Sequence, residues 1–158
     1  MIDDLALSRA LHVLFVTHWI GGVAFVTLVA LPLALANEEG ERGWALFAAI
    51  ERRFAAQVRV SIPLAGATGL WMTWRLDLWS RFADPGFWWM DAMAGLWALF
   101  MLIVFVIEPL VHPRLAAVAA RSPHAALRRL TFAHAVLLAL AIVTILGAVG
   151  GAQGGLFH

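Results

Sequence analysis

Residues 10–36 read ALHVLFVTHWIGGVAFVTLVALPLALA, and this stretch decides the fold because it contains no charged residue. A hydrocarbon core about 30 Å thick is crossed by roughly 20 apolar residues in an α-helix. A helix also satisfies its own backbone N–H and C=O groups, as lipid requires. The stretch therefore predicts a transmembrane helix at about residues 7–36, which ends at the polar run Asn37–Gly43.

Three later stretches are also long and apolar, and they are expected to cross the bilayer at about residues 58–79, 87–111 and 130–149. Composition agrees, because 63% of the 158 residues are hydrophobic and 13% are charged, whereas about a quarter are charged in soluble domains. The chain is predicted to be one domain, 1–158, an all-α integral membrane four-helix bundle with the lipid bilayer as its surroundings. The absence of cysteine excludes disulfides and thiolate metal sites.

The connections are predicted from polar and helix-breaking residues. The amphipathic segment 44–56 is expected to lie at the interface or to extend the second helix, and Asp84-Pro85-Gly86 is typical of a turn. The third span is expected to end at Pro113, and the basic segment 114–129 is predicted to be a linker in which Ser122-Pro123 starts the last helix. The acidic start at Asp3 and Asp4 predicts no cleaved signal peptide.

Arginine distribution predicts the orientation. With both termini on side A, side A carries Arg9, Arg75 and Arg81, and side B carries Arg42, Arg52, Arg53, Arg59, Arg114, Arg121, Arg128 and Arg129. Cytoplasmic loops are enriched in basic residues, so side B is expected in the cytoplasm and both termini in the periplasm of a bacterial inner membrane. Because these arginines belong to membrane loops, no nucleic-acid partner is expected.

Histidines are the main candidates for a functional site, since polar groups inside a membrane are costly and commonly functional. His12 and His18 lie in the first span, His112 closes the third and His134 lies in the fourth. Six residues turn a helix by about 240°, so His12 and His18 are expected on different faces. His112 and His134 are near enough in depth to share a ligand. His124 and His158 are expected at the surface.

Three interpretations of the four membrane histidines remain open. Haem b takes axial histidines from bundle helices, and one or two haems are expected here. Copper accepts imidazole and thioether ligands, which Met72, Met90 and Met93 would add to His12 and His18. The third interpretation is structural: the histidines bond to backbone carbonyls and the methionines fill gaps.

Other polar residues at membrane depth have simpler expected partners. Glu108 is expected to form a salt bridge with Arg114 rather than to carry protons. Arg59 and Gln57 open the second span on side B and are expected to bind haem propionates or lipid phosphates.

The first helix, Arg9-Ala10-Leu11-His12 followed by Trp19-Ile20-Gly21-Gly22, resembles the opening helix of the copper-resistance D (CopD-like) membrane family. It is also similar to the protoporphyrinogen oxidase family of small haem-binding membrane proteins. The resemblance continues through Gly69-Leu70-Trp71, His112 and Arg128-Arg129-Leu130. It implies a four-helix haem-binding or copper-handling bundle, with His12 as the matching first-helix histidine. The oxidase family has a lysine in its third helix, whereas this chain has none and reads Trp89-Met90-Asp91-Ala92-Met93 there.

The function expected from these features is that of a membrane b-type cytochrome that carries electrons between a quinol or small oxidant and a redox partner protein. His12 or His18 would bind haem in one half of the membrane, and His134 with His112 in the other. The alternatives are a copper transport or resistance protein, a protoporphyrinogen-oxidase-like enzyme, and a non-catalytic membrane anchor subunit. If the chain is an enzyme, it is expected to be an oxidoreductase.

Overall fold

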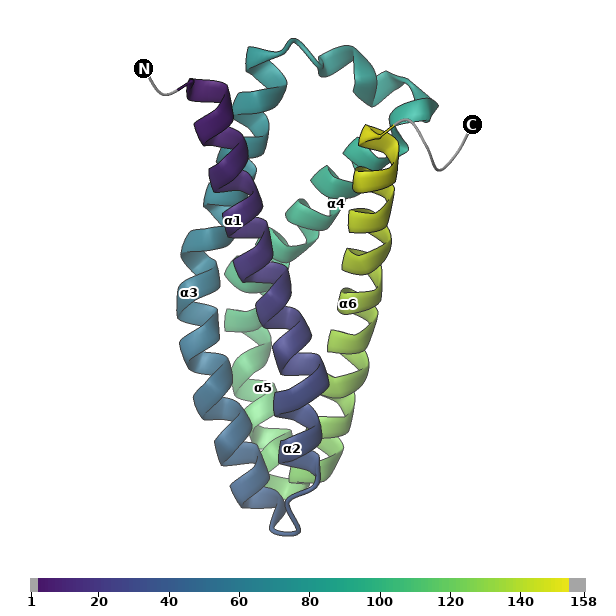
Figure 1. The fold of residues 1–158 in the computed structure, drawn as a ribbon. Helices are drawn as coiled ribbons and strands as arrows, with labels where there is room; N and C mark the ends of the chain where they lie inside the picture. The colour runs from purple at the N-terminus through teal and green to yellow at the C-terminus, as the bar shows by residue number, and fades with distance from the viewer. Residues whose placement is uncertain (1–2, 154–158) are drawn as a thin grey trace.

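The computed structural model describes residues 3–153, which form a bundle of long helices without a β-strand in that range (Figure 1). The prediction of an all-α fold is confirmed. Three helices are long and apolar enough to cross a membrane, namely Asp4–Leu35, Pro85–Arg121 and Pro123–Ala152. Helix α1 begins and helix α6 ends at the same end of the bundle (Figure 1).

The first rod consists of α1 (Asp4–Phe25), the π-helical turn η1 (Val26–Ala30) and α2 (Leu31–Leu35). Asp3 caps its start by accepting a hydrogen bond from the backbone N–H of Leu5. The π-helical turn ends two residues before Pro32, which has no backbone N–H and crowds the preceding turn. Widening the helix there accommodates the proline without breaking the rod.

Helix α3 (Gly40–Arg75) is continuous, so segment 44–56 extends the second long helix, as one of the two expected alternatives had it. The helix contains Pro63 and ends at Arg75, four residues before the expected end of the span. Asp77 follows with a φ of 50°, a left-handed conformation in which a helix cannot continue. Helix α3 is not among the three apolar spans, and it carries charged residues such as Arg52, Arg53 and Arg59.

Two short 3₁₀ helices, η2 (Trp79–Ala83) and η3 (Pro85–Phe87), lead into α4 (Trp88–Leu102), the π-helical turn η4 (Ile103–Ile107) and α5 (Glu108–Arg121). The predicted linker 114–129 is therefore wrong, because the helix continues through Pro113 to Arg121. A proline removes only one backbone hydrogen bond, and the alanine-rich sequence that follows has a high helix propensity.

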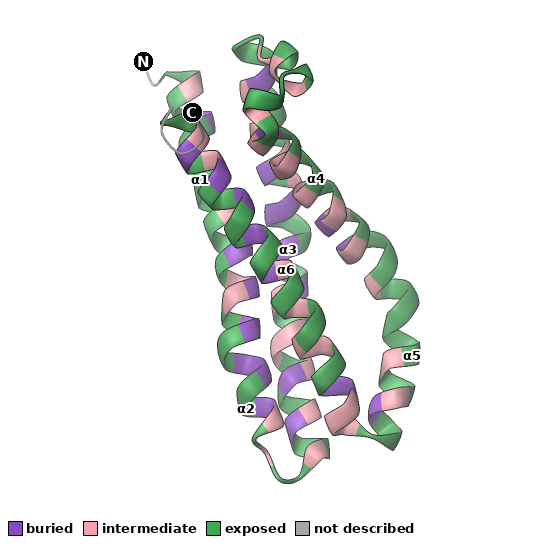
Figure 2. Cartoon of the chain, turned by 90° about the vertical axis from the view of Figure 1, so that its right-hand side faces the viewer, coloured by how far each residue is buried: buried purple, intermediate pink, exposed green. Residues whose placement is uncertain are grey.

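Helix α6 (Pro123–Ala152) is the last helix among residues 3–153, and it begins at the expected Ser122-Pro123 pair. Ser122 makes no side-chain capping hydrogen bond, so the start depends on the fixed φ of Pro123 at the first helical position. Helix α5 is exposed over most of its length (Figure 2), with Ala119 as its buried residue.

Small residues bring the helices into contact. A β-carbon at Gly66 would enter the indole ring of Trp97, and one at Gly147 would enter that of Trp88. In lipid, such close packing is a main source of helix association. The larger buried cluster lies where α1, α3, α4, η4 and α6 meet: Trp19, Ile20, Val23, Val58, Ile62, Ala65, Phe100, Val104, Leu138 and Ala141.

Candidate functional site

Most polar side-chain contacts between helices lie along one seam, where α1 and α3 run antiparallel. At the end where α1 begins, Arg75 Nε lies 3.3 Å from Asp4 Oδ2. Ser8 donates to the carbonyl of Thr68 one turn further along α1. Near the opposite end, Gly43 of α3 packs directly on the carbonyl of Ala34. The two helices therefore keep one register over almost their whole length.

His12 lies in this seam and is half-buried. Its Nδ1 is 2.9 Å from the carbonyl oxygen of Ala65 and 3.2 Å from Thr68 Oγ1. A carbonyl only accepts, so Nδ1 carries the proton and donates it. Among residues 3–153, nothing is hydrogen-bonded to Nε2, whose lone pair is available. Gly69 makes room for the ring, because a β-carbon there would lie 3.2 Å from Cε1.

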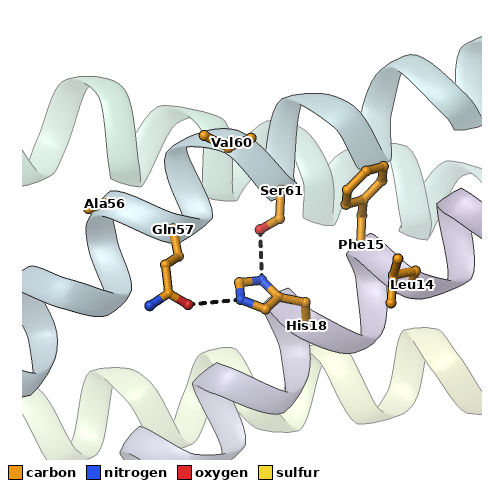
Figure 3. A pocket seen from close by; sticks show the side chains of 7 residues that line it. All are labelled: Leu14, Phe15, His18, Ala56, Gln57, Val60 and Ser61. Atoms are coloured by element: carbon orange, nitrogen blue, oxygen red, sulfur yellow. Dashed lines mark hydrogen bonds between the residues drawn. The ribbon is translucent and has the colours of Figure 1, made fainter.

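His18 lies on the same seam but uses both ring nitrogens (Figure 3). Nδ1 is 3.2 Å from Ser61 Oγ and Nε2 is 3.0 Å from Gln57 Oε1. The ring is exposed on the outer surface of the bundle and borders a hollow of about 580 Å³ between α1 and α3. With both nitrogens engaged by side chains, His18 is less suited than His12 to bind a metal.

His134 repeats the arrangement of His12 within one helix. Its Nδ1 is 2.9 Å from the carbonyl oxygen of Leu130, one turn earlier in α6. The ring meets that of Phe47 edge to face at 6.4 Å between centroids, and it is half-buried. Here too Nδ1 donates, and Nε2 is the nitrogen without a hydrogen-bond partner in the described chain.

His112 is exposed on α5 and belongs to a cluster of charged groups rather than to an imidazole pair. It interacts electrostatically with Glu51 of α3. Glu51 also interacts electrostatically with Glu108 and Arg59. Glu108 accepts a hydrogen bond from Arg59 at 2.8 Å, so the prediction that Glu108 pairs with Arg114 is wrong. Arg59 is thus already occupied by a carboxylate rather than free for a propionate.

The predicted histidines are not brought to one point. His12 lies beside Ala65 and His134 beside Phe47, which places them about 27 Å apart along α3 at 1.5 Å per residue. They cannot share one iron. His134 contacts Phe47, and His112 interacts electrostatically with Glu51, one turn further along α3. No hydrogen bond or ring contact joins these two imidazoles within the described residues.

The remaining candidates add no further ligand cluster. His124 packs on Gly40 at the start of α3 and is half-buried, and His158 lies outside the described residues. Met90 is buried, and Met72 and Met93 are half-buried. In the part of the chain that the structure describes, no three His, Asp or Glu side chains gather in a group able to hold a metal ion.

Several groups that connect α3 to its neighbouring helices were not among the residues singled out in the sequence. Ser61 and Thr68 are single hydroxyls in an apolar stretch, and only their seven-residue spacing, two helical turns, marks a common face. Trp97 donates its indole N–H to the carbonyl of Ile62 at 3.0 Å and packs on Gly66. No protein-family model, characterised protein or solved structure matches this chain.

Proposed function

We propose that the chain is a multi-pass protein of a bacterial inner membrane with four spanning helices. These are the three apolar helices together with α3. The antiparallel pairing of α1 and α3 supports this proposal, because α3 follows the apolar rod Asp4–Leu35 from Arg75 to Gly43. The part of α3 that crosses the membrane would then begin before residue 58, the expected start of the second span. Side B, with its eight arginines, would face the cytoplasm.

The function proposed for this bundle is that of a b-type cytochrome. The observation that carries it is the state of His12 and His134: each imidazole donates from Nδ1 to a backbone carbonyl and keeps Nε2 available. A hydrogen bond of this kind fixes the tautomer and the ring orientation of metal-ligating histidines. It also makes the ligating nitrogen a better electron donor to a metal.

The donor set fits haem, since imidazole is the commonest axial ligand of b-type iron and half-burial limits access of water. A bound haem would supply one-electron transfer between ferrous and ferric iron. His12 would serve the half of the bundle where α1 begins, and His134 the half nearer the connection of α2 to α3. Because about 27 Å separates them along α3, each would bind its own haem.

The test is haem content and a dithionite-reduced minus oxidised optical spectrum of the purified protein. We expect a b-type spectrum with two haems per chain, of which His12→Ala and His134→Ala each remove one. His124→Ala is the matched control, because His124 packs on Gly40 at the end of the bundle. A spectrum without a haem band after expression with ample haem, or full haem content in both variants, would refute the proposal.

The same protein separates the alternatives. Copper handling predicts stoichiometric Cu(I) that is lost when Met72 or Met93 is replaced. Protoporphyrinogen oxidation predicts turnover of that substrate, and an anchor subunit predicts that every His→Ala variant still assembles with its partner. No contact in the seam favours any of these three over haem binding.

A further inference from the structure

His18 and Gln57 are exposed on the outer surface of the bundle, and buried Ser61 lies beneath them in hydrogen-bond contact with His18. The neighbours of His18 on the outer surface are apolar: Leu14 and Val60 are each 59% exposed. In a membrane these two side chains would meet lipid tails. An ionisable group on such a surface is rare, and intramembrane ionisable residues usually face protein, a cavity or a ligand.

The depth of His18 decides what can reach it. It lies about 21 Å along the helix from Asp4, in a continuous apolar rod of 32 residues. Exposed apolar side chains occur on both sides of it, from Leu7 to Leu33. His18 thus lies well inside the lipid-facing surface. Phospholipid headgroups and free ions stay at the interface, whereas a lipid-soluble molecule can reach this position.

The hollow beside His18 has the size and the lining of a ligand site. Its volume of about 580 Å³ falls within the roughly 300–1,000 Å³ of small-molecule pockets. Leu14, Phe15 and Val60 give it an apolar wall, and Gln57 and Ser61 flank the imidazole (Figure 3). Mainly apolar walls with a few convergent polar groups are typical of such sites.

The polar groups can exchange hydrogen bonds in either direction. A neutral imidazole has one donor and one acceptor nitrogen, the amide of Gln57 has both kinds of group, and the Ser61 hydroxyl donates or accepts. The trio can therefore donate to a carbonyl oxygen and equally accept from a hydroxyl. An acyl chain offers neither group and gains nothing from this arrangement.

We infer that the hollow at His18 binds the ring of a lipid-soluble quinone or quinol. Such a molecule is apolar enough to reach this depth and carries carbonyl oxygens in one redox state and hydroxyls in the other. The ring lies against the apolar wall and one of its oxygens bonds to His18, with Gln57 or Ser61 reorienting to suit. A quinol was already expected as a partner of the cytochrome; the inference assigns its binding site, and it does not depend on haem.

The experiment measures binding of decylubiquinone and of menadione to the protein in nanodiscs, by quenching of tryptophan fluorescence and by photo-crosslinking with an azidoquinone. We expect saturable binding of one quinone per chain and crosslinks that map to α1 and α3. His18→Ala removes a hydrogen bond and should weaken binding about tenfold. Ala56→Leu fills the hollow from an exposed lining position and should abolish binding.

Ala67→Leu is the matched control, because residue 67 is exposed on the same face of α3 three turns further along. It should bind quinone like the unaltered protein. Non-saturable partitioning alone, or unchanged affinity in both His18→Ala and Ala56→Leu, would overturn the inference. Haem content of Ala56→Leu is measured in parallel: its retention while quinone binding is lost separates the two sites. If the purified protein binds quinone but contains no haem, this inference is supported and only the cytochrome proposal is refuted.

Discussion

The contact between Gly43 and the Ala34 carbonyl predicts a large effect from adding one methyl group. Gly43→Ala would place its β-carbon well within the van der Waals contact distance of that backbone oxygen. Neither helix can yield by rotating a side chain, so α2 and α3 would have to separate. Overpacking of this kind costs about 1–3 kcal/mol, and a main-chain obstacle favours the upper part of that range.

A matched variant removes the intrinsic preference of alanine for helices from the comparison. Gly95→Ala has the same chemistry on α4, where a β-carbon would meet nothing within 4 Å. It should gain up to about 1 kcal/mol from helix propensity. The assay is the free energy of unfolding in mixed micelles, by titration with SDS and circular dichroism. We expect the unfolding free energy of Gly43→Ala to be about 2 kcal/mol or more below that of Gly95→Ala. Equal unfolding free energies would refute the close approach of α2 and α3.

Three further predictions concern contacts between helices. Replacing Arg59 or Glu108 singly with leucine leaves an unpaired charge at membrane depth. In a double-mutant cycle of unfolding, the double variant should therefore be about 1 kcal/mol more stable than the sum of the two single losses predicts. Additive losses would contradict the ion pair. Trp97→Phe keeps a ring but removes the indole hydrogen bond to α3, and its unfolding free energy should fall by about 1 kcal/mol, whereas no change would show that the bond is not formed. Gly69→Val should crowd the imidazole of His12 and lower haem content toward that of His12→Ala, and full occupancy would contradict the placement of that ring.

The sequence predicted the helices more reliably than their ends. The charge-free stretch 10–36 predicted the first rod, because an uninterrupted apolar run has no alternative structure in lipid. Proline was a poor guide to helix ends: Pro113 was expected to stop a helix, yet α5 continues to Arg121. Breaking a helix at a proline requires other partners for the freed groups, and an alanine-rich continuation favours keeping the helix.

The candidate histidines were found by residue type, but their environments depend on the register between α1 and α3, which the sequence does not specify. His12 and His18 were expected on different faces, yet both hydrogen-bond to α3: His12 to the Ala65 carbonyl, and His18 to Gln57 and Ser61. Glu108 pairs with Arg59, 49 residues away, rather than with nearby Arg114. Partners that are close in sequence are easily proposed, whereas contacts across the bundle require the fold.

The antiparallel pairing of α1 and α3 has a consequence for how the protein enters the membrane. Helix α3 is too polar to count among the apolar spans, and its Gln57, Ser61 and Thr68 meet polar groups of α1. A ribosome delivers α1 first, so α3 would leave the translocon beside a helix that already matches its polar edge. Biogenesis should then proceed by insertion of α1 and α3 as a hairpin, and α3 alone, fused to a glycosylation reporter, should insert poorly unless α1 precedes it.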